Sequence, residues 1–530
     1  LTGNAIVDPT ASVCSTTTIS ITTSDDIFLN NVLRATISVT LVAGTDGTGS
    51  IINPTVGTLD IDTVTLTMTA ANNIGTAANP IEMNVGTVRA TSTVFGSIFL
   101  LDSNVLPDSN GVTGAASGIN PAGVTVLGAT TVDGEINVNV VDGALNVMAP
   151  TTFPRNNGID ANDADGSGNG DVTLIAFGAI CLGTDGTADA LGVGTPASFL
   201  ALSDVEATDL ITLTADAVVD CDPTLVDVAA PRVNVTSARL LANGTNGFGT
   251  AANPIETSVS FMDANIETNG LFVDNFIAGL MTLTDIDLDL FSLEDPTLAS
   301  VSRSVVVNHS PMTIDASIVQ AGSIIRTAGE TEDPDFNTDD LTVVDAADDD
   351  GTNVTISSTA NSVTLQAGDD ISIGDAASTD AITISAATAI RLDAQFGESG
   401  DNTGVAGDSI TVVAAEGAGL TTITSTDGGV NIQMNTRNGV TLGGEAITAG
   451  TGSIVINAGT DGDGGAVSLG AMSAASLTVT AFGDITDTAA LTVTGASSFT
   501  STTGEVVLNT AANEFTGAVN ATAANDVTIA

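Results

Sequence analysis

An acidic stretch in the first third of the chain has the residue types of a calcium site. Through residues 160–171, oxygen-bearing side chains alternate with small residues, and the glycines permit a tight wrap. Ca²⁺ takes about six to eight oxygen ligands on a flexible loop. The candidate ligands are Asp160, Asp163, Asp165, Asn169 and Asp171. No Glu closes the loop as in an EF-hand, so a plain solvent-exposed turn is the alternative interpretation.

A second acidic cluster, at residues 345–353, offers the same chemistry with fewer alternating ligands. Its candidate ligands are Asp348 and Asp350. Ca²⁺ is the only cofactor that these two clusters suggest, because carboxylates and amides are hard oxygen donors. Solvated turns on the outside of an acidic protein would have the same composition.

The three cysteines are too few for a disulfide framework. Cys181 and Cys221 are candidates for a disulfide between neighbouring coils of the chain, which leaves Cys14 over. The alternative is that they are small buried hydrophobic residues.

A catalytic site is difficult to assemble from this sequence. His309 is the one histidine, and no second histidine or lysine accompanies it; Lys, Tyr and Trp are absent and the nine basic residues are scattered arginines. A polysaccharide-degrading enzyme would need cations near the sugar acid and aromatic platforms for the rings. We therefore expect no enzymatic activity, and such an enzyme is only a remote alternative.

Composition limits the partners as well as the chemistry. The chain has 63 acidic against nine basic residues and a net charge of −54, which disfavours nucleic acid because phosphate binding needs clustered cations. Hydrophobic residues make up 43% of the chain, too many for a disordered protein of this charge. No apolar run is long enough to span a membrane. The sequence thus predicts a folded protein with a core of small and β-branched residues.

The local pattern is a succession of short alternating segments separated by Gly, Asn and Asp. Segments 18–22, 64–69, 136–140, 286–290 and 477–480 alternate apolar and polar residues, which is typical of half-buried strands. From about residue 340 such segments recur at roughly 20-residue spacing, as expected for solenoid coils. We expect an all-β fold, an elongated β-solenoid rod, with small β insertions allowed.

One eight-residue segment occurs twice, as 75–82 and again as 249–256, each time after a large apolar residue. An identity of this length indicates one structural unit used twice, within 70–105 and 244–277. The expected organisation is a solenoid with longer, irregular coils over 1–326, an acidic loop or boundary at 327–353, and more regular coils over 354–530. The last part is expected to continue into a neighbouring molecule or a longer chain.

The duplicated unit, with the apolar run that begins at Gly96, resembles a recurring segment of filamentous-haemagglutinin-like and autotransporter-passenger-like surface proteins. So does Asn513 to Val519, with its spaced Asn, Phe, Gly and Val. The resemblance covers 70–105, 244–277 and 510–530. It implies a right-handed parallel β-helix in a secreted protein of the cell surface, and it carries no active site.

These observations favour an extracellular structural protein, a subunit of a surface filament, sheath or matrix. Its expected partner is a second copy of itself, head to tail or lateral. The alternative is a monomeric adhesin stalk that binds a host or cell-surface ligand. Cell-surface glycans and other matrix proteins are further candidate partners.

Overall fold

The computed structural model describes residues 4–7, 12–103, 123–149, 158–161, 170–184, 203–221, 233–277, 279–284, 303–329, 339–345, 353–374, 380–396, 408–413, 421–425, 430–443, 446–459, 462 and 464–530. Within these ranges the chain is all-β, and every recorded strand pairing is parallel, as in a β-solenoid. The predicted fold class is confirmed. The chain divides into two compact units, 1–259 and 260–530.

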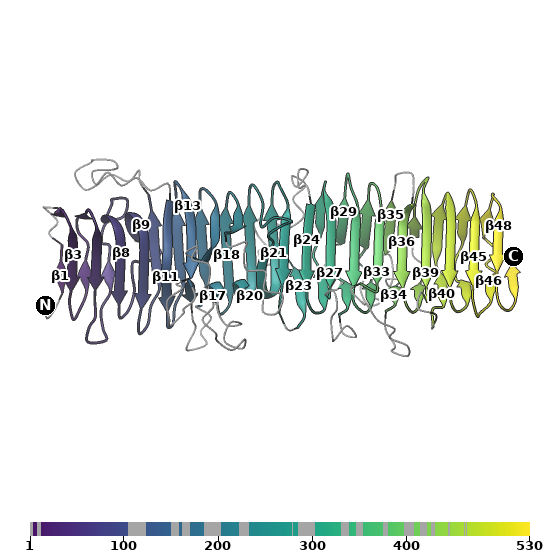
Figure 1. Cartoon of the computed structure of the whole chain (residues 1–530), viewed down its shortest axis with the longest axis horizontal. Helices are drawn as coiled ribbons and strands as arrows, with labels where there is room; N and C mark the ends of the chain where they lie inside the picture. The colour runs from purple at the N-terminus through teal and green to yellow at the C-terminus, as the bar shows by residue number, and fades with distance from the viewer. Residues whose placement is uncertain are drawn as a thin grey trace. The chain divides into compact units, whose positions relative to one another are not determined.

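Unit 1 stacks its coils through several parallel series of strands (Figure 1). The first series is β3 (Thr18–Thr22), β6 (Ser38–Val42), β8 (Ile61–Ala70), β9 (Ile81–Ser92), β11 (Gly123–Thr131), β14 (Ile159–Ala161), β17 (Ser203–Ala207) and β20 (Val233–Gly244). The second is β10 (Ile98–Asp102), β12 (Ile136–Val140), β15 (Val172–Ala176) and β18 (Leu210–Ala215). The third is β13 (Ala144–Ala149), β16 (Ile180–Thr184) and β19 (Val218–Asp220). The short strands β1 (Ala5–Ile6), β4 (Ile27–Phe28) and β7 (Ile51–Ile52) form one further series, and β2 (Val13–Ser15) and β5 (Leu33–Ala35) lead into β8.

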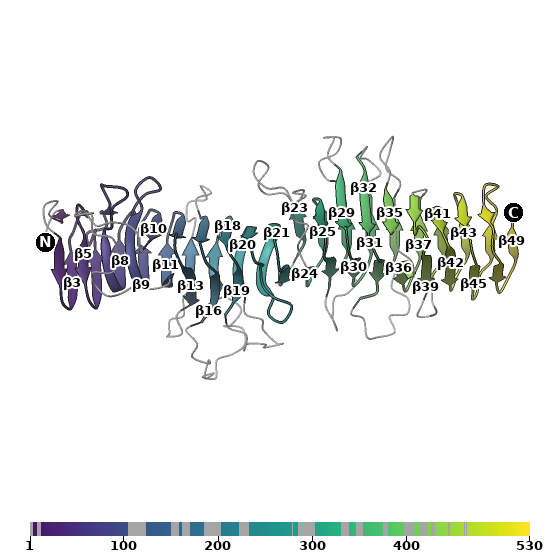
Figure 2. The same cartoon turned by 90° about the horizontal axis from the view of Figure 1, so that it is seen from above.

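Unit 2 has three long series, and Figure 2 separates β29, β32 and β35 from the layer of β30 and β36. The first is β22 (Leu271–Asn275), β24 (Arg303–Asn308), β27 (Ser323–Ala328), β30 (Val363–Ala367), β33 (Ile390–Ala394), β36 (Val430–Thr436), β39 (Ser453–Ala458), β42 (Ser476–Ala481), β45 (Ser497–Ser501) and β48 (Val519–Thr522). The second follows β21 (Ile255–Ile266), which spans the division between the units: β23 (Met281–Thr284), β25 (Met312–Asp315), β28 (Leu341–Val343), β31 (Ile371–Ile373), β34 (Ile410–Val412), β37 (Val440–Leu442), β40 (Val467–Leu469), β43 (Ile485–Asp487), β46 (Val506–Leu508) and β49 (Val527–Ile529). The third is β26 (Ile318–Gln320), β29 (Val354–Ser358), β32 (Ile382–Ala386), β35 (Thr422–Ser425), β38 (Ala446–Thr448), β41 (Ala471–Ala474), β44 (Leu491–Val493) and β47 (Glu514–Phe515).

The core of each unit is a set of columns in which apolar side chains from successive coils lie in register. In unit 2 one fully buried column runs through Leu365, Leu392, Met434, Ile456, Val479 and Phe499. A single coil cannot bury its apolar face, but stacked coils can, and their backbones bond from coil to coil. The alternating pattern of the sequence is therefore the cause of the fold.

The spacing of the coils is less regular than the sequence suggested. Met434, Ile456, Val479 and Phe499 follow one another at intervals close to the predicted spacing. Leu392 and Met434 are also neighbours in the column, although a much longer stretch of chain separates them. Insertions between coils thus preserve the register of the core.

The division into two compact units falls between residues 259 and 260, and the acidic loop or boundary expected at 327–353 stays a prediction. Strands on either side of 327–353 pair in register, β25 with β28 and β27 with β30. The stack is therefore continuous across the acidic stretch. Segment 286–290, predicted as a strand, lies outside the described residues.

The duplicated segment forms the same turn in both of its copies, each in unit 1. Thr76 donates its backbone N–H to the carbonyl of Asn79 at 2.9 Å, and Thr250 does so to Asn253 at 2.8 Å. The glycine before each turn has a positive φ, 69° at Gly75 and 67° at Gly249, which favours glycine there. A twelve-residue strand follows each turn, β9 and β21. The sequence identity thus marks one repeated structural unit.

Candidate functional site

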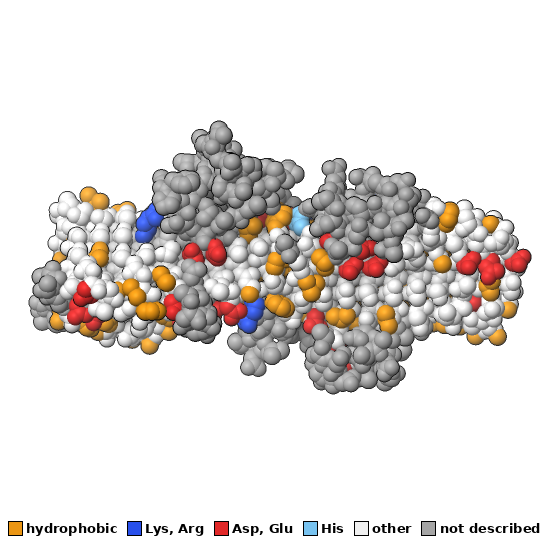
Figure 3. Space-filling model, turned by 90° about the horizontal axis from the view of Figure 1, so that it is seen from below, with side chains coloured by type: hydrophobic (Ala, Val, Ile, Leu, Met, Phe, Trp, Pro, Cys, Tyr) orange, Lys and Arg blue, Asp and Glu red, His pale blue; other side chains and the backbone are white. Residues whose placement is uncertain are grey.

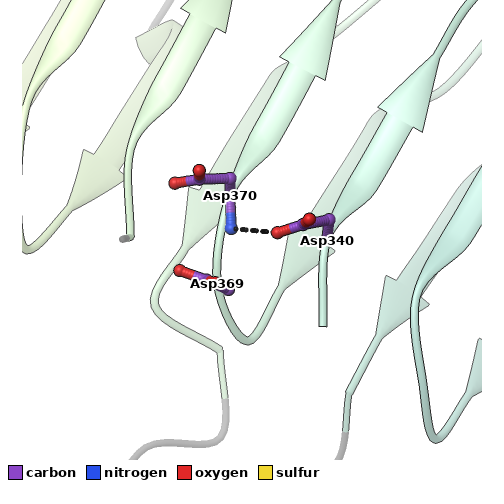
Figure 4. A group of neighbouring side chains, drawn as sticks. All are labelled: Asp340, Asp369 and Asp370. Carbon is purple, nitrogen blue, oxygen red and sulfur yellow. Dashed lines mark hydrogen bonds between the residues drawn. The ribbon is translucent and has the colours of Figure 1, made fainter. Parts of the chain in front are cut away.

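Three aspartates of unit 2 form the one group among the described residues that could hold a metal ion. Asp340, Asp369 and Asp370 each offer a carboxylate oxygen, and these oxygens lie within 4.8 Å of one another (Figure 4). Asp340 directly precedes β28, and the other two directly precede β31, the next strand of the same series. The stacking of two coils therefore brings the three carboxylates together.

The same aspartates bind the backbone of the neighbouring coil. The carboxylate of Asp340 accepts the N–H of Asp370 at 3.2 Å, as Figure 4 shows. Asp369 accepts the N–H of Asp408 at 2.8 Å, and Asp370 accepts the N–H and hydroxyl of Ser409 at 2.7 and 2.8 Å. Each carboxylate thus accepts a hydrogen bond from a backbone N–H in a turn, where no neighbouring strand supplies an acceptor. These hydrogen bonds, which stabilise the fold, are enough to explain an aspartate at each of the three positions.

Burial changes the acidity of two members of the group. Desolvation raises the pKa of Asp369 to about 6, opposed by its hydrogen bond from Asp408 and assisted by the charges of Asp370 and Asp340. Desolvation also raises the pKa of Asp340. A divalent cation would relieve this clustering of negative charge. Three hard oxygen donors suit Ca²⁺ in kind, but water would have to supply the remaining ligands.

The carboxylates of the predicted loop at 160–171 that can be described have separate surroundings. Asp160 lies on β14, in register with Thr130 and Glu206 of the neighbouring coils. Asp171 precedes β15 and accepts the N–H of Leu210 at 3.1 Å. Burial raises its pKa. The candidates Asp163, Asp165 and Asn169, and the second cluster's Asp348 and Asp350, lie outside the described residues.

Asp171 belongs to a polar row along one corner of unit 1. In this row a side chain just before a strand accepts the backbone N–H of the equivalent residue one coil further on. Asn4 accepts from Asp26, Asp26 from Ser50, Asn73 from Ser97, Ser97 from Glu135, and Asp171 from Leu210. The signal in the sequence is Asp, Asn or Ser immediately before an Ala, Ile or Val that begins a strand or an isolated bridge. It indicates a turn-capping role for Asp26 and Asp171.

Cys181 and Cys221 are joined in a disulfide, with Cα atoms 5.6 Å apart. Cys181 lies on β16 in register with Val219 of β19, so the bond links neighbouring coils. Cys14 is free and exposed. Of the two interpretations of this pair, the structure shows the disulfide.

His309 has a carboxylate partner that the sequence did not reveal. Its Nε2 lies 2.7 Å from Oδ1 of Asp274, and its ring stacks on Phe276 at 4.2 Å between centroids. Asp274 is on β22 and His309 directly follows β24, the next strand of the series. The 35-residue separation hid this pair, because only the coil register brings the residues together.

Comparison with known families finds one local match. Residues 457–522 match the family described as repeats of unknown function (DUF5649), over the coils from the end of β39 to β48. No curated protein and no solved structure gives a match. Across the described residues, no helix is long and apolar enough to cross a membrane.

Proposed function

We propose that this chain is an extracellular structural protein, a building block of a surface filament, sheath or matrix. The observation that carries the proposal is the uninterrupted stack in unit 2, in which β22 to β48 pair in parallel register through ten successive strands. In this part of the chain, described residues form the columns of the core and the turns that hydrogen-bond to the next coil. Such a stack is a rigid scaffold, which is what a surface assembly needs.

The disulfide between Cys181 and Cys221 supports the extracellular location. Disulfides persist in oxidising compartments and are rare in the cytosol. The acidic surface supports solubility outside the cell, because a net charge far from zero keeps molecules apart until an ordered contact or a counter-ion overcomes the repulsion. In Figure 3 acidic side chains lie in separate groups on an otherwise mostly uncharged surface.

A divalent cation is part of this proposal. Asp340, Asp369 and Asp370 are the described residues that would hold it, and Ca²⁺ is the ion that their oxygen donors suit. The proposed function involves no catalytic step.

Sedimentation velocity of the full chain tests the proposal. Over a wide range of protein concentration at physiological salt, we expect larger species to grow at the expense of the monomer. Added salt should promote them, because screening weakens the repulsion between copies that each carry a charge of −54. A chain that sediments as a monomer at every concentration and salt level would overturn the proposal.

A further inference from the structure

Unit 1 has a sheet face made almost wholly of hydroxyl side chains. Its fifteen outward positions, in register across five strands, are Thr18, Ser20 and Thr22 on β3, Ser38, Thr40 and Val42 on β6, Thr65, Thr67 and Thr69 on β8, Thr87, Arg89 and Thr91 on β9, and Thr125, Gly128 and Thr130 on β11. All of them reach solvent, while most alternate positions of the same strands fill the core; Ile21 and the bulge residue Leu127 are half-buried. Twelve of the fifteen carry a hydroxyl. We call these positions the hydroxyl face.

The hydroxyl face carries no carboxylate, although the chain has 63 acidic residues. Its only charged member is Arg89. The acidic residues of these strands, Asp62 and Glu82, are buried near the strands' N-terminal ends. The next strand of the series ends the neutral region, because Asp160 of β14 lies in register with Thr130.

Exposed apolar side chains border the same face. Ile37 and Val64 directly precede the first hydroxyl positions of β6 and β8, and they are 55% and 40% exposed. They lie on neighbouring coils, since Thr65 donates its N–H to the carbonyl of Ile37 at 3.1 Å. Phe95 and Val132 are exposed in turns at the opposite border, where Asp46 and Asp133 also lie. Among the described residues, no exposed acid lies at the border with Ile37 and Val64.

Unit 2 also has hydroxyl-rich strands, for example β29 and β32, but without this border. Its exposed large apolar side chains among the described residues are Phe261, Leu280, Val527 and Ile529, and none lies on those strands. The combination of a neutral face with exposed apolar residues is thus found in unit 1.

From this combination we infer that the hydroxyl face of unit 1 binds the hydroxyl face of a second copy of the chain. The inference rests on the proposed structural function and names the surface through which two copies pair. Two molecules that each carry a charge of −54 approach with least repulsion through a surface without carboxylates. Each outward residue covers about 33 Å² of the sheet, so the fifteen cover about 500 Å² per copy. The two copies together then bury about 1,000 Å², the lower bound for a specific interface.

Charge substitutions at the centre of the face test the inference. Thr67→Glu and Thr67→Lys both place an unpaired charge in the interface, so each should raise the dissociation constant for self-association at least tenfold in sedimentation velocity. If only net charge governed association, Thr67→Lys would strengthen it and Thr67→Glu would weaken it. Thr478→Glu and Thr478→Lys, on the outward face of β42 in unit 2, are the matched controls and should leave association unchanged. Circular dichroism checks that every variant is folded.

Crosslinking gives a second measurement that does not depend on disrupting the face. In a Cys14→Ser background, Thr67→Cys should form covalent dimers with a short bis-maleimide, whereas Thr478→Cys should not. Self-association that persists in both Thr67 charge variants would overturn the inference that the hydroxyl face is the interface. The proposed function would still stand in that case. A wild-type chain that stays monomeric would overturn both. A monomeric chain retained by an insoluble polysaccharide, with retention lost in Thr67→Glu, would also overturn the inference, because the face would then have a different occupant.

Discussion

Asp102 stands opposite Val140 in the parallel pair of β10 and β12, with Met83 on its other side in the same inward column. Both neighbours are fully buried and Asp102 is 3% exposed, so a carboxyl group occupies a position of the hydrophobic core. Its oxygen accepts the N–H of Val85 at 3.3 Å. Burial raises its pKa to about 7, opposed by that hydrogen bond and assisted by the charge of Asp142.

Asp102 should make unit 1 less stable as pH rises from about 4 to about 7. In that window the folded state holds a proton that the unfolded state has lost, so the free energy of unfolding falls with pH. A shift of this size corresponds to at most about 4 kcal/mol. Asp102→Asn cannot ionise, and its unfolding free energy should therefore fall less over this window than that of the wild type. Denaturant unfolding at a series of pH values measures the difference, and parallel pH profiles of the two proteins would show that Asp102 is not the cause.

Arg326 is a second charge in the core, this time in unit 2. It lies in register between Val306 and Leu365 and is 2% exposed. Its Nη1 donates to the carbonyls of Ser304 and Ile325, at 3.3 and 2.9 Å, while its Nε has no hydrogen-bond partner. Replacing a buried charge with an apolar side chain of similar volume is often stabilising, by about 1–4 kcal/mol. We predict that Arg326→Met raises the free energy of unfolding by an amount in this range.

The pH dependence of the same variant gives an internal check. Burial lowers the pKa of Arg326 to about 9, so above that pH the unfolded state holds a proton that the folded state has lost. Wild-type stability should therefore rise above about pH 9, and the advantage of Arg326→Met should shrink. The chain has no Lys or Tyr, which leaves few other groups to titrate there. A loss of stability in Arg326→Met at pH 7 would mean that the guanidinium has a partner that compensates its charge.

Removing the disulfide should weaken unit 1. Cys181 and Cys221 are 40 residues apart, and opening a loop of that size costs about 2–4 kcal/mol through the entropy of the unfolded chain. Cys181→Ser combined with Cys221→Ser should lower the free energy of unfolding by this amount under oxidising conditions. Cys14→Ser is the control and should change nothing. Equal stabilities of the double variant and the wild type would count against a disulfide in the native protein.

Asp370 should contribute to stability through its hydrogen bonds to Ser409. Asp370→Ala leaves the N–H and hydroxyl of Ser409 without this acceptor, at a cost of about 1–3 kcal/mol. Asp370→Asn keeps an acceptor oxygen and should cost less. If Ca²⁺ binds the aspartate cluster, it should raise the melting temperature of the wild type more than that of Asp370→Asn. Equal stability of Asp370→Ala and the wild type would contradict the claim that Asp370 stabilises this turn.

The fold could be predicted because its cause is local. Alternation within 18–22 and 136–140 marks strands β3 and β12 to the residue, and Gly, Asn and Asp mark the turns between strands. The sites could not be predicted because they depend on register between coils of unequal length. Asp340 meets Asp370, and Asp274 meets His309, only when the intervening insertions are known. Arg326 follows two isoleucines in β27, and nothing in that sequence distinguishes it from a surface arginine.

Electron microscopy of the negatively stained full chain tests the proposed structural role most directly. At high protein concentration and physiological salt, we predict regular assemblies of many copies. If a divalent cation contributes, a chelator should shorten or disperse them. Separate single particles under every condition, with circular dichroism showing the expected β-structure, would contradict the role of the chain as a building block.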